Sequence, residues 1–139
     1  MSIPVPFKPD QKITDVFKEG RFTLSAEILP PRNGSSQRGV LEQVQRLISS
    51  GAEFLSVTKG AGGSLRGGSL PIAQVIKETF GVPCIAHFTC RDLTQAEVEN
   101  HLVDHHFLEF ETSWHSAEIL QMVSLTGFLE KTATHMHIS

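Results

Sequence analysis

The sequence predicts an α/β fold, namely the first three βα units of a (β/α)8 TIM barrel, left incomplete. Strand-like runs alternate with helix-like segments between residues 21 and 108, at a spacing of about thirty residues. This alternation is typical of right-handed βαβ units and a parallel sheet. Each predicted strand also has one apolar and one partly polar face, whereas helices on both sides would make both faces apolar. The barrel is therefore favoured over an open doubly wound sheet.

The predicted elements follow a lead-in segment at 1–20. Strands are expected at 21–31, 52–58 and 82–89, because these runs are rich in β-branched, aromatic and apolar residues. Two prolines end the first strand, since proline cannot donate a hydrogen bond to a sheet. The residues 21–108 are thus interpreted as a partial barrel domain.

Helix-like segments fill the intervals between these strands. In 40–48 and 70–76, apolar residues recur at the spacing of one helix face, and each segment is followed by a glycine that can end a helix. The third helix has the strongest start signal, because Thr94 and Glu97 match a capping box.

Composition limits the classes of partner. The chain has 139 residues, 40% of them hydrophobic, and a formal net charge of -3 without a block of Lys or Arg. A nucleic-acid or anionic-membrane partner would need a concentrated positive face. No apolar run approaches the roughly 20 residues of a membrane span, and the N-terminus does not resemble a signal peptide. With two cysteines that fit a reducing compartment, these features predict a cytoplasmic protein that binds small molecules.

Three chemically capable side chains are expected at the carboxyl ends of the strands, on the partly polar face: Glu27, Thr58 and His87. This is where a barrel enzyme keeps its active site. Glu27 is flanked by apolar residues, so we expect a desolvated carboxyl whose pKa is raised enough for it to act as a general acid. The alternative is a carboxylate paired with a cation.

A glycine-rich loop follows the second predicted strand, with five glycines among residues 60–68. It lacks the Gly-Lys-Ser/Thr ending of a Walker A motif, and Leu65 stands where a dinucleotide fingerprint needs its last glycine. The bare backbone could approach a large planar or phosphorylated ligand. Simple turn chemistry is the alternative, although it accounts for only one or two of these glycines.

Cysteine and histidine positions suggest a zinc site that strand geometry argues against. His87 should point away from Cys84 and Cys90 on a regular strand, so we expect core cysteines, a ligand-facing histidine and no metal. His105 and His106 are interpreted as surface residues, because no companion ligands of the right type accompany them.

Three motifs, "SAEILPPR", "FLSVTKGAGGS" and "CIAHFTCRD", occur in this order. Together they resemble the methylenetetrahydrofolate reductase family, over a stretch from about Thr23 to Leu108. The resemblance implies a (β/α)8 barrel that carries FAD. It also implies reduction of 5,10-methylenetetrahydrofolate to 5-methyltetrahydrofolate, with the hydride taken from NADH or NADPH and the folate as substrate.

The resemblance also implies roles for individual residues. Glu27 matches the acid that helps to open the five-membered ring of the folate. Thr58 matches a residue at the flavin and nicotinamide site, Ala61 a backbone position that contacts the flavin, and His87 another flavin contact. Lys59 stands at a cofactor-binding position where many members of the family carry tyrosine.

The segment 109–139 departs from the family and is interpreted as an out-of-frame tail. Back-translation from Glu109 with one added G gives "GIRNILALRGDPPDG" in the neighbouring frame, which resembles the family's fourth strand and its flavin motif. Trp114 and Met122 each have a single codon, which limits the freedom of this reading. We therefore expect a truncated and inactive polypeptide.

The first and third strands of such a fragment would keep unpaired edges, which allow homo-oligomers to form. Three interpretations of the chain are open, the leading one being a reductase fragment that carries the acid and part of the flavin site. One alternative is a non-catalytic barrel fragment that acts as an interaction or ligand-binding module. Another is a different barrel enzyme of pterin or corrinoid methyl transfer.

Overall fold

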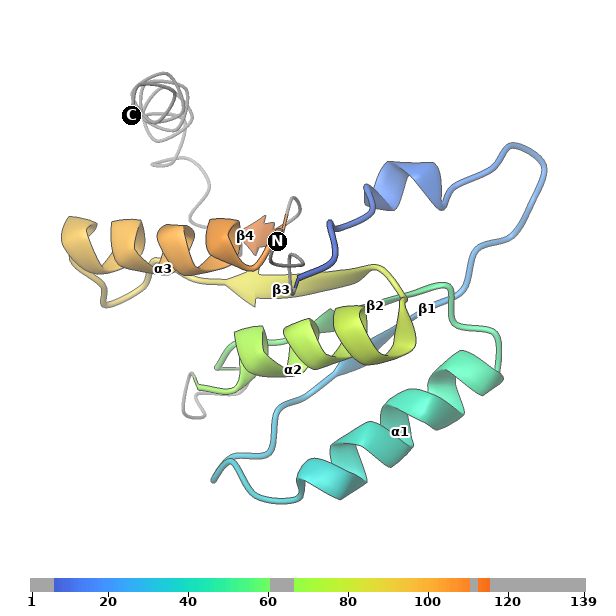
Figure 1. Ribbon diagram of the computed structural model, residues 1–139, viewed down its shortest axis with the longest axis horizontal. Helices are drawn as coiled ribbons and strands as arrows, with labels where there is room; N and C mark the ends of the chain where they lie inside the picture. Colours follow the sequence, from blue (N-terminus) through green and yellow to red (C-terminus); the bar gives the residue numbers. More distant parts are fainter. Residues whose placement is uncertain (1–6, 61–66, 111–112, 116–139) are drawn as a thin grey trace, which may run out of the picture.

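A computed structural model describes residues 7–60, 67–110 and 113–115 of the chain. A short 3-10 turn in the lead-in segment precedes alternating strands and helices (Figure 1). The elements in chain order are η1 (Ile13–Asp15), β1 (Ser25–Ile28), α1 (Gln37–Ser49), β2 (Phe54–Val57), α2 (Ser69–Val75), η3 (Ile76–Phe80), β3 (Cys84–Phe88), α3 (Gln95–Phe107) and β4 (Ser113–His115).

The four strands form one sheet in the order β1-β2-β3-β4, and each neighbouring pair is parallel. Successive strands are joined by helices, as a parallel sheet requires. The predicted α/β class and the parallel arrangement are therefore confirmed. The strands are shorter than expected, since the ladder covers only four or five residues in each of the first three.

The core lies on one face of this sheet. Ile28, Leu55, Val57 and Ala86 are fully buried there, against apolar side chains of the helices that include Val44 of α1. Figure 1 shows α1, α2 and α3 following one another across the sheet, with α2 in front of β2. The predicted alternation of apolar and partly polar faces is confirmed, because these four residues have the parity expected for the apolar face.

The helix ends agree with the sequence. The predicted stop glycines, Gly51 and Gly81, have φ values of 100° and 64°, in the left-handed region that favours glycine. At the start of α3, the Thr94 hydroxyl accepts from the Glu97 N–H, and the Glu97 carboxylate accepts from the Thr94 N–H at 2.7 Å. Donation to the Glu97 carboxylate from the Thr94 N–H, and from the Thr94 hydroxyl at 2.8 Å, lowers the pKa of Glu97. The predicted capping box is confirmed.

The edge of the third strand is paired, contrary to expectation. Ser113–His115 forms β4 beside β3, within the segment interpreted as an out-of-frame tail. Phe110 precedes it and is 8% exposed in the core, with its N–H bonded to the His105 carbonyl. Burial of this aromatic ring brings the chain back to the sheet after α3. Residues 111–112 and 116–139 of this segment lie outside the described residues.

The two cysteines differ in their surroundings. Cys84 is buried in the core, and burial, with a smaller contribution from the Asp10 charge, raises the pKa of its thiol to about 12. It is therefore a protonated, apolar core residue. Cys90 is only half-buried, so the expectation of a second core cysteine is wrong: it lies two residues past the end of β3, outside the sheet.

His105 is buried rather than on the surface, which corrects the prediction made for it. Its side chain is 5% exposed and packs edge-on against the rings of Phe88 and Phe110. Its Nδ1 lies 2.7 Å from the carbonyl oxygen of His101, which fits a neutral ring that donates from Nδ1. His106, its neighbour, is exposed.

Acid should therefore destabilise the fold through His105. Burial lowers the pKa of this ring, and the charges of Lys59 and His101 add to the effect, while the His101 carbonyl and Asp104 oppose it. Since the unfolded state then binds the proton more readily, the stabilisation is complete above about pH 6.5 and is lost as the pH falls below it. Urea unfolding between pH 7.5 and 5.5 should show this loss, and His105→Gln should reduce it. An equal reduction in the exposed control His106→Gln would contradict the role of His105.

Candidate active site on the open face of the sheet

Polar side chains from three neighbouring strands meet on the face that is turned away from the helices. Glu27 of β1 and Ser56 of β2 are register partners, and the Ser56 hydroxyl donates to the Glu27 carboxylate at 3.4 Å. His87 of β3 places its Nε2 3.8 Å from the same carboxylate oxygen. The sheet thus brings together two of the predicted site residues, Glu27 and His87, with a serine beside them.

The expected desolvation of Glu27 is wrong. Its side chain is 53% exposed, and that of His87 is 30% exposed. Its apolar neighbours Ala26 and Ile28 point to the opposite face, into the core, so they do not surround the carboxyl group. A carboxylate and an imidazole that are both open to solvent can still contact a ligand placed over this face.

Thr58 stands immediately after β2, on the same face as Ser56. Its N–H donates to the carbonyl of Ile28 at 3.0 Å, which fixes the backbone against the end of β1. Its side chain is buried, and within the described residues its Oγ1 has no hydrogen-bond partner. A buried hydroxyl without a partner is unfavourable, so this atom is suited to bind a polar group of a ligand.

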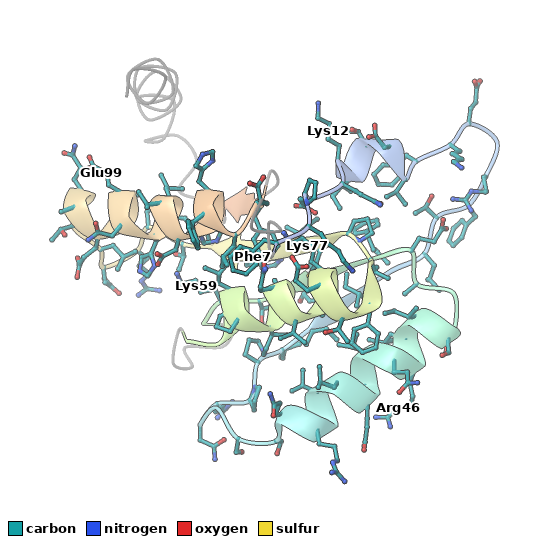
Figure 2. All side chains as sticks on the ribbon, in the orientation of Figure 1. Phe7, Lys12, Arg46, Lys59, Lys77 and Glu99 are labelled. Carbon is teal, nitrogen blue, oxygen red and sulfur yellow. The ribbon has the colours of Figure 1, made fainter. Side chains whose placement is uncertain are left out.

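The other two predicted cofactor contacts do not join this group. The side chain of Lys59 lies over the ring of Phe88, with Nζ 4.7 Å from the ring centroid, and Figure 2 shows it on the side of α3. Phe88 belongs to the core face, so the Lys59 ammonium lies on the side of the sheet opposite Glu27. Ala61 lies outside the described residues.

A hollow lies elsewhere, between the N-terminal parts of α1 and α2. Its volume is about 580 Å³, and its lining includes Pro31, Asn33, Val40 and Ile72. Neither Glu27 nor His87 borders it. The candidate site around Glu27 and His87 is therefore distinct from this hollow.

Ser56 is the residue that sequence analysis missed. Its hydroxyl contacts the carboxylate of Glu27, and no motif marks it. Only its position in the strand indicates that it belongs to the site, because Ser56 precedes Thr58 by two residues and therefore shares its face. Only the register of β1 against β2 shows that it lies directly beside Glu27.

Comparison with known proteins decides the family. A model of the methylenetetrahydrofolate reductase family matches residues 12–110, which is more than half of the chain. The chain belongs to the methylenetetrahydrofolate reductase family. Membership agrees with the resemblance of the three sequence motifs, all of which lie within the matched residues.

Individual relatives in this family are similar over part of their length. Methylenetetrahydrofolate reductase (NADH) 1 of Arabidopsis thaliana is 31% identical over 91 residues, covering 66% of this chain and 15% of that protein. The 5,10-methylenetetrahydrofolate reductase of Pectobacterium carotovorum is 31% identical over 111 residues, covering 80% of this chain and 34% of the relative. The Escherichia coli enzyme of the same name is 32% identical over 89 residues, which is 64% of this chain and 29% of that enzyme. The chain therefore spans about a third or less of the length of these relatives.

Within 7–60, 67–110 and 113–115, none of the helices is both long enough and apolar enough to cross a bilayer.

Proposed function

We propose that this chain carries the acid and one side of the flavin site of a methylenetetrahydrofolate reductase, on the first units of a TIM barrel. The reaction is the reduction of 5,10-methylenetetrahydrofolate to 5-methyltetrahydrofolate. The observation that carries the proposal is the placement of Glu27 and His87 within 3.8 Å of each other at the strand ends. Their strands belong to motifs within the family match.

The residues present fit a flavin in two respects. Thr58 offers a buried hydroxyl without a partner among the described residues, and His87 offers a half-buried imidazole on the same face. Lys59 does not fit, because its ammonium lies over Phe88 on the other side of the sheet. We therefore propose Thr58, His87 and the backbone at Ala61 as flavin contacts, and a contact of Lys59 through its backbone alone.

Bound FAD would supply the hydride, after its own reduction by NADH or NADPH. The names of the Arabidopsis thaliana and Zea mays relatives specify NADH, which favours NADH as the reductant. The protein itself would supply the proton. Glu27 would act as the acid, with its carboxyl group passing a proton to a nitrogen of the folate, which opens the five-membered ring. The Ser56 hydroxyl and the His87 ring, both close to the carboxyl oxygen, would hold it in place.

Flavin binding tests the first part of this proposal. Titration of the purified chain with FAD should quench the flavin fluorescence, and His87→Ala should weaken the binding by about tenfold, the value of one good hydrogen bond. His106→Ala removes an exposed histidine of α3 and serves as the control, with no change expected. If FAD does not bind, or if His87→Ala binds it as the parent chain does, the flavin assignment is wrong.

The acid is tested by folate turnover. We propose that residues 109–139 are read out of frame, so the gene is first sequenced across the codons of Phe107 to Phe110. In the product of the frame that encodes "GIRNILALRGDPPDG", Glu27→Gln should lower folate reduction by about 100-fold or more and leave reduction of the flavin intact. Unchanged folate turnover would refute the acid role.

A further inference from the structure

We propose that Ser69 is a positioning residue, whose buried hydroxyl sets the spacing of the two strand ends that carry Thr58 and His87. Ser69 is the first residue of α2 and is 3% exposed. Its Oγ donates to the carbonyl oxygen of Val57 at 3.0 Å and lies 3.4 Å from the carbonyl oxygen of His87. The inference rests on the proposed function, in which Thr58 and His87 contact the ligand.

The hydroxyl acts at the point where the ladder between β2 and β3 ends. The last paired residues are Val57 and Ala86, so Thr58 and His87 stand one step beyond the pairing. One hydroxyl proton shared between the two carbonyls connects the strands at this level, with the shorter bond to Val57 dominant. The carbonyl of Val57 adjoins Thr58, and the other carbonyl belongs to His87. The Ser69 hydroxyl therefore acts through the backbone of the two residues whose side chains would face the ligand.

The turn that precedes Ser69 packs closely against the chain just after β1. Gly68 has a φ of +87°, and a Cβ at this position would lie 3.3 Å from the Cβ of Pro30, just after β1. A side chain here would be strained by its backbone and crowded by Pro30. The start of α2 is therefore held close to the ends of β1, β2 and β3 together, as a preorganised site requires.

The test compares Ser69→Ala with Ser69→Thr in the full 139-residue chain. Amide hydrogen exchange is measured by NMR at Thr58, beside the proposed clamp, and at Val44, in the core away from it. Binding of FAD is measured in parallel. Ser50→Ala is the matched control, because the Ser50 hydroxyl also donates to a backbone carbonyl, that of Arg46, at the far end of α1.

Ser69→Ala should speed exchange of the Thr58 amide by about five- to tenfold relative to Val44, and should weaken FAD binding by a similar factor. Ser69→Thr keeps the hydroxyl and should restore both, whereas Ser50→Ala should change neither. If Ser69→Ala does not fold, Ser69→Cys, which keeps the size and weakens the donor, is judged by the same criteria.

The outcomes separate the role of Ser69 from the proposed function. Exchange that rises equally at Thr58 and Val44 would mean a general loss of stability and would overturn the positioning role. So would unchanged exchange at Thr58. If even the parent chain fails to bind FAD, the flavin assignment falls, while the ratio of the two exchange rates still decides whether Ser69 holds the strand ends.

Discussion

Replacing Lys77 with methionine is expected to lower the free energy of unfolding by about 3 kcal/mol, because it leaves two backbone carbonyl groups without their donor and breaks the ion pair with Glu78. The Lys77 side chain is 4% exposed, and its Nζ donates to the carbonyl oxygens of Lys8 and Leu108, the latter at 2.6 Å. It also lies 4.9 Å from the centroid of the Phe110 ring. Figure 2 shows Lys77 near Phe7, where the lead-in segment passes η3.

Methionine largely replaces the aliphatic part of the lysine side chain, so the variant tests the contribution of the ammonium group. The carbonyl groups of Lys8 and Leu108 would remain without this donor, at a cost typical of buried unsatisfied groups. Urea unfolding followed by circular dichroism measures the change. Lys8→Met is the control, since its Nζ donates to the backbone carbonyl of Glu78 at an exposed site and should contribute less than about 1 kcal/mol. Equal losses in the two variants would contradict the special role of Lys77.

Replacing Phe88 with alanine should destabilise the chain by about 3 to 5 kcal/mol, the range for loss of a buried aromatic ring. Phe88 is 1% exposed and packs edge-on against the rings of His101 and His105 of α3, with the Lys59 ammonium over its face. It therefore joins β3 to α3. Truncation would leave a cavity between the strand and the helix.

The matched control for this prediction is Phe88→Leu, which keeps most of the apolar volume and should cost less than half as much. Thermal and urea unfolding of both variants measures the difference. If the alanine variant unfolds at the same urea concentration as the leucine variant, the ring contacts with α3 do not stabilise the chain, and its docking must depend on other residues.

The local elements could be predicted from the sequence because their signals are local. The capping box of Thr94 and Glu97, and the glycines that end the first two helices, depend on residues a few positions apart. The alternation that puts Glu27 and His87 on one face has a period of two and can be read from each strand alone. The parallel α/β class can likewise be predicted, because it follows from the order of strands and helices along the chain.

The predictions that are wrong concern features that are set by contacts between residues far apart in the chain. His105 is expected at the surface because no companion metal ligands accompany it, yet the rings of Phe88 and Phe110 cover it. Glu27 was expected to be desolvated by residues adjacent in sequence, although these point to the opposite face. The partner of β3 was missed because the three residues of β4 carry no strand pattern of their own, and their pairing depends on the packing that precedes them.

The sequence by itself determined the order of strands and helices, the faces of each strand and the family, since all of these are recorded in periodicity and motifs along the chain. The tertiary structure alone decided which side chains meet. It placed Ser56 beside Glu27, turned Lys59 toward Phe88, and set Ser69 between the ends of β2 and β3. The physical reason is that strand register and helix docking are fixed by the packing of residues far apart in the chain, whose distances no local pattern specifies.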